Sequence, residues 1–143
     1  MTVRQALKEK NKLVSEIRSL YEIAKNYNSI EEGNPRRYSV GQAIKKAGEL
    51  TQNLIELKAK IHKANTVVYE KIFNMAELKL RAKFIKSMNC DEGKVTERYG
   101  SVAMVKTVEI NIAERDIMVK TIESEIEKLQ DELDYHNAIT VIE

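Results

Sequence analysis

Hydrophobic residues at the start of the chain recur every seven positions, in two columns that lie three residues apart. The first column is Val3, Ile17 and Ala24, with Lys10 as its one charged member, and the second is Ala6, Leu13, Leu20 and Tyr27. This spacing puts both columns on one face of an α-helix, so it predicts an amphipathic helix over residues 2–27 that packs against another helix. Thr2 and Gln5 have the spacing of a capping box at its N-terminus.

A second heptad pattern predicts a helix over residues 40–65. Its columns are Val40, Ala47, Leu54, Ile61 and Val68, and Ala43, Leu50, Leu57 and Ala64. Ser39 and Gln42 form another candidate capping box, and Asn65 suits a left-handed C-cap. Residues 28–38 contain the only proline and read as a loop. A loop of this length between similar helices favours an antiparallel hairpin.

Two further helices are predicted in the second half of the chain. The shorter one runs from about residue 75 to 88, with Asn74 as its N-cap. Its hydrophobic positions are Leu78, Ala82, Ile85 and Met88, with Leu80 and Phe84 beside them. The longer one, over residues 109–137, has the columns Ile112, Val119, Ile126 and Leu133, and Arg115, Ile122, Leu129 and His136.

Three segments with β-branched residues are candidate strands: residues 66–69, 102–108 and 139–142. They would form a small sheet at one end of the helices. The pattern leaves open whether residues 99–108 are strand or helix. The predicted fold class is mainly α, with antiparallel coiled-coil-like helical hairpins or a four-helix bundle, a small β element at one end, and a single domain over residues 1–143.

The composition supports long helices and separates charge along the chain. Only five Gly and one Pro occur in 143 residues, and 32% of the residues are charged. The net charge of +2 is too small to indicate nucleic-acid binding by the whole chain. Residues 2–27 and 40–66 are basic, whereas residues 109–136 carry nine acidic against three basic residues. Because acidic residues oppose the dipole at a helix C-terminus, we expect this helix to pair with the first two; the alternative is a charged partner.

Cysteine use and hydropathy bear on location. Cys90 is the single cysteine, so no internal disulfide can form, which fits a reducing compartment. Lysines and arginines interrupt the N-terminal apolar residues, which argues against a cleavable signal peptide. No run approaches the roughly 18 apolar residues of a membrane span. We therefore expect a cytoplasmic protein, or one inside a phage particle.

Two basic clusters are candidate interaction sites. They are Arg36, Arg37 and Tyr38 in the first loop, and Lys79, Arg81, Lys83 and Lys86 on the shorter helix. Such residues can contact phosphates or bases. The alternatives are an ordinary solvated surface and, on the helix, ion pairs with the acidic last helix.

The residue patterns of common catalytic sites are not found. The glycines do not cluster into a phosphate-binding loop, and no serine has a nucleophile-elbow context. His62 and His136 would meet in an antiparallel bundle, where a metal site would also need Asp134 or Glu132; neither histidine has the spacing of a metal-binding pair. We expect no enzymatic activity, cofactor, metal or small-molecule substrate.

Several short stretches resemble a family of small bacterial proteins known as septicolysin-like. They are residues 3–7, 31–35, 61–66, 78–83 and 106–110, and the last helix with Asn137. The chain departs from the family pattern at Ala138, where an aromatic residue is expected, and in the third helix, which lacks an Arg-Asp pair. The resemblance implies a coiled-coil-like helical fold, and the family's name hints at membrane activity.

These observations favour a helical interaction or structural protein that self-associates, with a symmetric dimer as the default. Three long apolar stripes and one shorter helix leave part of the apolar surface uncovered in a monomer. A protein partner is an alternative to self-association. A bacteriophage or virion structural component would use the same architecture. A membrane-active protein would use the first helix on lipid, and a nucleic-acid-binding protein would use the basic clusters.

Overall fold

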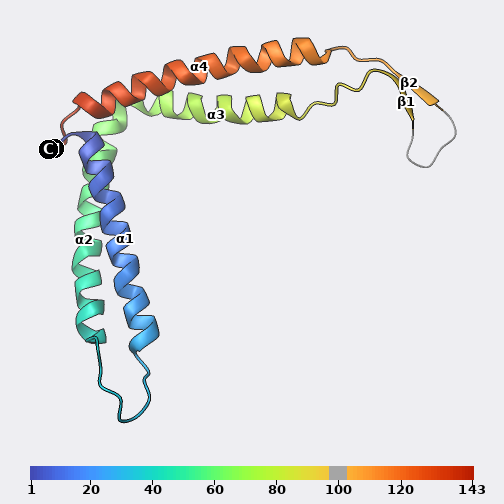
Figure 1. The fold of residues 1–143 in the computed structure, drawn as a ribbon. Helices are drawn as coiled ribbons and strands as arrows, with labels where there is room; N and C mark the ends of the chain where they lie inside the picture. The colour runs from blue at the N-terminus through green and yellow to red at the C-terminus, as the bar shows by residue number, and fades with distance from the viewer. Residues whose placement is uncertain (97–102) are drawn as a thin grey trace. The chain divides into compact units, whose positions relative to one another are not determined.

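The computed structural model describes residues 1–96 and 103–143. Their elements are α1 (Val3–Tyr27), α2 (Val40–Asn65), the 3₁₀ turn η1 (Thr66–Val68), α3 (Tyr69–Lys86), β1 (Gly93–Thr96), β2 (Ala103–Lys106) and α4 (Ile112–Ile139). As predicted, the fold is mainly helical, with helical hairpins and a small β element (Figure 1). The chain divides into two compact units, Met1–Val67 with Tyr135–Glu143, and Val68–Asp134.

The first unit is built on the hairpin of α1 and α2, which lie side by side along their length (Figure 1). Its core cluster consists of Leu13, Ile17 and Leu50, with Leu20, Leu54 and Leu57 packed against it. All six positions belong to the predicted heptad columns. The antiparallel hairpin is thus confirmed, and the seven-residue period identified the side chains that hold it together.

Both helices of this hairpin begin at the predicted caps. The Thr2 hydroxyl accepts a hydrogen bond from the Gln5 amide, and the Gln5 side chain accepts one from the Thr2 amide. The Ser39 hydroxyl accepts from the Gln42 amide. α2 ends at Asn65 as predicted, but the predicted left-handed C-cap is wrong, because Thr66 caps the helix in a right-handed conformation, with φ −53° and ψ −36°.

Residues 66–69 are helical, which corrects the prediction of a strand. Thr66–Val68 forms η1, and α3 begins directly at Tyr69, so Asn74 lies inside the helix rather than at its N-cap. The Thr66 hydroxyl donates to the His62 carbonyl, and Val68 is buried. Burial of one β-branched side chain within a continuing helical backbone outweighs the local β propensity.

The second unit is built on the hairpin of α3 and α4 (Figure 1). Its buried cluster consists of Ala82, Ile85, Val119 and Ile122, with Leu78, Met88, Met118 and Ile126 packed against it. The four stripe positions predicted for this shorter helix are therefore confirmed, whereas Leu80 and Phe84, which were predicted to lie beside them, are exposed. Ion pairs join Lys71 to Glu132 and Lys86 to Glu123, so residue numbers rise along α3 as they fall along α4 and the helices are antiparallel.

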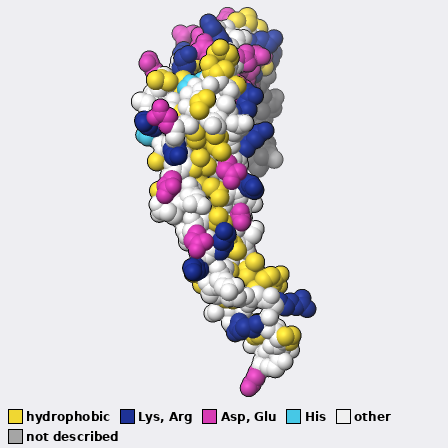
Figure 2. Space-filling model, turned by 90° about the vertical axis from the view of Figure 1, so that its left-hand side faces the viewer, with side chains coloured by type: hydrophobic (Ala, Val, Ile, Leu, Met, Phe, Trp, Pro, Cys, Tyr) yellow, Lys and Arg dark blue, Asp and Glu magenta, His cyan; other side chains and the backbone are white. Residues whose placement is uncertain are grey.

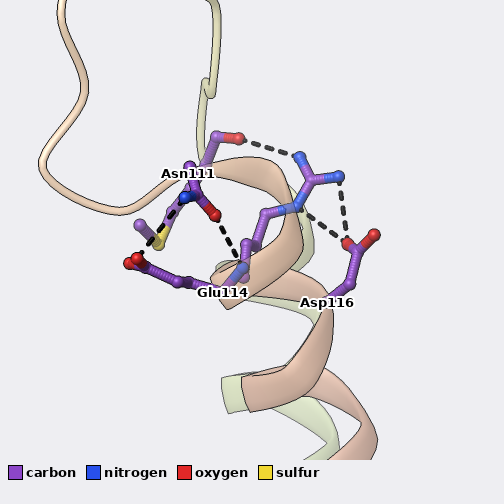
Figure 3. Close-up of polar contacts among 5 residues, drawn as sticks. Asn111, Glu114 and Asp116 are labelled. Carbon is purple, nitrogen blue, oxygen red and sulfur yellow. Dashed lines mark hydrogen bonds and ion pairs between the residues drawn. The ribbon is translucent and has the colours of Figure 1, made fainter.

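α4 starts at Ile112, three residues later than predicted. The Asn111 side chain accepts a hydrogen bond from the Glu114 amide at 2.9 Å, which is the usual role of an N-cap (Figure 3). Arg115 donates to the Met88 carbonyl at 3.2 Å and pairs with Asp116 (Figure 3). These contacts fix the first turn of α4 against the segment that follows α3.

The β element is a hairpin rather than a sheet of the three predicted segments. β1 pairs antiparallel with β2, with Gly93 opposite Lys106 and Lys94 opposite Val105. Of the candidate strand at residues 102–108, Ala103–Lys106 is a strand, whereas β1 was not predicted. Residues 99–102 of the undecided segment lie outside the described residues.

The third predicted strand pairs with the N-terminus. Val141 forms a single antiparallel bridge with Thr2, and Ile139 still belongs to α4. The Val3 amide donates to the Thr140 carbonyl at 2.8 Å, and the Ile142 amide donates to the Met1 carbonyl at 2.9 Å. The two ends of the chain are therefore hydrogen-bonded to each other within the first unit.

Two isoleucines of α4 test which face stabilises the second hairpin. Ile122 is 7% exposed, whereas Ile117 is 65% exposed. Ile122→Ala should lower the free energy of unfolding by about 2–5 kcal/mol, because it leaves a cavity in the core, and the matched change Ile117→Ala should cost no more than about 0.5 kcal/mol. Urea denaturation followed by circular dichroism, at one protein concentration, measures both. Equal losses would show that the assigned core face is wrong.

Candidate functional site

The first candidate site is a hollow of about 380 Å³ at the loop between α1 and α2. It is lined by Tyr27, Ile30, Asn34, Pro35, Arg36, Arg37 and Tyr38. All three loop residues predicted to contact a partner, Arg36, Arg37 and Tyr38, therefore lie together. What the hollow can bind depends on whether their side chains are available.

Arg36 closes the C-terminal end of α1. Its guanidinium donates to the carbonyl of Tyr27 at 2.9 Å and to the carbonyl of Asn28 at 3.1 Å. Carbonyls at the end of a helix lack partners within the helix, and a positive charge there also favours the helix dipole. Arg36 thus holds the loop against the helix, which is a structural role that the sequence pattern did not indicate.

Tyr38 is also used inside the loop. Its ring packs against that of Tyr27, with the ring centroids 4.7 Å apart and the planes tilted by 57°. The loop turns at Gly33, whose φ of +86° favours glycine, and the Asn34 amide donates to the Glu31 carbonyl. Of the predicted triplet, two side chains make contacts that shape the loop, and Arg37 is exposed beside them.

The second candidate site is the basic surface of α3. Lys79, Lys83 and Lys86 line a hollow of about 280 Å³ together with Ala82, Glu123 and Ile126. Lys86 is paired with Glu123 at 2.5 Å, so one of these charges is neutralised within the hairpin. Arg81 does not line the hollow, because its position on the helix places it on another side of α3. The structure therefore brings three of the four predicted basic residues together.

A second ion pair fixes the other end of this hairpin. Lys71 binds Glu132 at 2.5 Å. This hydrogen bond and the charge of Lys71 hold the pKa of the Glu132 carboxyl below its usual value, against a smaller effect of desolvation, and the charge of Lys128 lowers the pKa further.

The origin of these lysines corrects one expectation. The basic partners of Glu123 and Glu132 come from α3, not from the first two helices. The reason is that α4 as far as Asp134 belongs to the same compact unit as α3. The first hairpin contributes a different pair, in which Lys63 of α2 lies 3.5 Å from Glu143.

His136 joins two helix ends in the first unit. Its Nε2 lies 3.1 Å from the Asn65 side-chain oxygen, and its Nδ1 lies 3.1 Å from the Thr140 hydroxyl. Sequence reasoning missed this use of Asn65, because it assigned the residue a backbone role only. Within residues 1–96 and 103–143, no group of three or more His, Cys, Asp or Glu residues is placed to hold a metal ion.

Comparison with known proteins gives no functional assignment. No protein-family model, curated protein or solved structure matches the chain. The resemblance to the septicolysin-like family therefore remains a prediction. Among the helices described, none combines the length and the apolar character needed to cross a membrane.

Replacing Arg36 tests its role at the end of α1. Arg36→Ala removes both hydrogen bonds to the carbonyls of Tyr27 and Asn28, so the last turn of α1 should open more easily. We expect a loss of about 1 kcal/mol in local stability, measured as faster amide hydrogen exchange in that turn. The neighbouring change Arg37→Ala is the matched control and should leave exchange there unchanged. If both variants behave alike, Arg36 does not cap the helix.

The Lys71–Glu132 pair predicts a specific pH dependence. Because folding lowers the pKa of Glu132, the ionised Glu132 carboxylate stabilises the folded state. This contribution is fully present above the ordinary glutamate pKa, and it is lost as the pH falls through the lowered pKa. Lys71→Met should raise the pKa of Glu132 in an NMR titration. Lys128→Met should raise it less, since Lys128 acts only through its charge. An unchanged pKa in Lys71→Met would refute the pairing.

Proposed function

We propose that this chain is a non-enzymatic helical interaction protein that self-associates, with the cytoplasm as its place of action. The observation that carries the proposal is the number of large hydrophobic side chains that remain exposed on helices whose cores are already assigned. Such surfaces usually mark contacts with another molecule. The single, half-buried and unpaired Cys90 is compatible with a reducing compartment.

The first hairpin leaves part of its apolar surface open because two helices cover each other on one side only. Tyr21, Ile44 and Ile55 are exposed although Leu13 and Leu50 are buried. Hydrophobic side chains form a band along the visible face of this hairpin, with charged side chains on both sides (Figure 2). An apolar band with a polar rim is one possible contact surface, and the second hairpin offers another.

The second hairpin exposes larger side chains. Four large side chains outside the hairpin core are exposed: Phe73, Leu80 and Phe84 of α3, and Ile117 of α4. A helix that is apolar on more than one side is usually buried on more than one side. Self-association supplies the missing cover without requiring a second protein. The same assembly would serve a virion component as well as a cellular scaffold.

A binding site for nucleic acid has less support. Of the seven predicted basic or aromatic contact residues, Arg36 and Tyr38 shape their own loop, and Lys86 pairs with Glu123. Recognition of phosphates needs basic groups that are free to exchange counterions for the nucleic acid. We therefore rank apolar self-association above a charge-driven partner.

Light-scattering mass measured behind size exclusion tests the proposal. We expect a discrete oligomer, at least twice the chain mass of 16.4 kDa, that persists from low to high salt, because apolar contacts are not screened by ions. Mixing the protein with duplex DNA provides the control and should leave the elution unchanged. A 16.4 kDa species at every salt and protein concentration would contradict self-association. A salt-sensitive shift with DNA would favour the nucleic-acid alternative.

A further inference from the structure

α3 has a second apolar stripe in addition to the one in the hairpin core. Phe73, Leu80 and Phe84 are 64%, 60% and 69% exposed. Leu80 follows Phe73 by seven residues and Phe84 follows it by eleven, which is about two and about three turns of an α-helix. The three side chains therefore project within about 20° of one line along the helix.

This second stripe lies on the far side of α3 from the core. Leu78, Ala82 and Ile85 face α4. At 100° per residue, Leu80 points roughly 160° away from Ala82 and roughly 140° away from Ile85. α4 covers one face of α3, and the opposite face presents two phenylalanines and a leucine to solvent. The stripe is thus a separate surface and not an extension of the hairpin core.

An aromatic contact gives the stripe a fixed end. The rings of Tyr69 and Phe73 are stacked, with centroids 5.7 Å apart and planes 15° from parallel. Stacking limits the rotation of Phe73, so less side-chain entropy is lost when another surface covers it. Tyr69 also lies on the same side of α3 as the stripe, because it precedes Phe73 by four residues.

We propose that this stripe, Phe73, Leu80 and Phe84, binds the same stripe of a second copy of this chain, with the two α3 helices antiparallel about a twofold axis. The inference rests on the proposed self-association and identifies the surface responsible for it. A twofold contact is isologous, which means that one surface must be complementary to itself when turned around. The stripe and the charges on one of its flanks meet that condition.

The apolar residues define where the twofold axis passes. Phe73 and Phe84 are equally distant from the middle of the stripe, between Leu78 and Lys79. An axis at that point places Phe73 of one copy opposite Phe84 of the other, at both ends of the contact. Leu80 then lies near the axis, against its own counterpart. Every large side chain of the stripe gains an apolar neighbour.

The charges on one flank of the stripe indicate almost the same axis. Glu77 and Arg81 lie on one flank of the stripe, about 40° and 80° from Phe73 around the helix. Antiparallel packing brings this flank against the same flank of the second copy. An axis at residue 79 places Glu77 of each chain opposite Arg81 of the other chain, which gives two pairs of opposite charges. The registers required by the apolar residues and by the charges differ by half a residue.

The first experiment removes the apolar stripe and compares it with an equally simple change elsewhere. The double variant with Phe73→Gln and Phe84→Gln should have a dissociation constant at least ten times that of the wild type. Analytical ultracentrifugation measures both constants. The matched control is Ile44→Gln with Ile55→Gln, because each of these residues of α2 is 54% exposed. The control should retain the wild-type dissociation constant. Circular dichroism should show that both variants keep their helices, since all four positions are exposed.

The second experiment uses charge to test the antiparallel arrangement. Glu77→Arg makes both flanking positions positive, and Arg81→Glu makes both negative. Each variant alone should dimerise at least tenfold more weakly than wild type, since like charges then face each other across the axis. An equimolar mixture should recover the wild-type affinity as a heterodimer, because every pair is again opposite in charge.

Each outcome has a separate meaning. If the wild type is a monomer, the proposed self-association fails together with this surface. If the wild type is an oligomer that the α3 changes leave intact and the α2 changes disrupt, self-association stands and the α3 surface is wrong. If the Arg81→Glu chain alone associates as tightly as wild type, the helices are not antiparallel in this register.

Discussion

The structure depends on the fact that a pair of helices can bury only the faces that they turn toward each other. Leu13, Ile17 and Leu50 fill that contact in the first hairpin, and Ala82 and Ile122 do so in the second. In both hairpins other large apolar side chains, such as Ile44 and Phe84, stay exposed to solvent. Since burial is worth roughly 25 cal/mol for each Å² of apolar surface, covering these side chains would stabilise the folded chain. This constraint is the physical basis of the proposed self-association.

Polar contacts determine how each hairpin is closed. Arg36 binds the carbonyls at the end of α1, Asn111 caps the start of α4, and Lys71 and Lys86 pair with carboxylates of α4. The exposed ion pairs contribute little to stability by themselves, but they favour one register of the two helices. The charged residues that were candidates for binding a partner are thereby used in part within the fold. This is why the apolar surface, rather than the basic one, carries the functional proposal.

The sequence predicted the first hairpin well because its signals are local. The heptad columns define the buried face, and Thr2 and Ser39 are caps that can be recognised within four residues. The second half was harder because its signals are not local. Asn74 has the character of a cap, but the helix continues through it from Tyr69, and β1 acquires its structure only by pairing with β2. Likewise, no local pattern shows that a loop arginine will reach back to α1. The earlier start of α3 is also what adds Phe73 to its exposed stripe, so this surface was not visible from the sequence alone.

An isotope-filtered NMR experiment on an equal mixture of labelled and unlabelled protein detects only contacts between different molecules, so it shows whether two copies of the chain meet through α3. We expect cross-peaks between the ring protons of Phe73 in one chain and those of Phe84 in the other, which is the proposed contact. Intermolecular cross-peaks that involve Ile44 or Ile55 of α2, with none from the two phenylalanines, would contradict it.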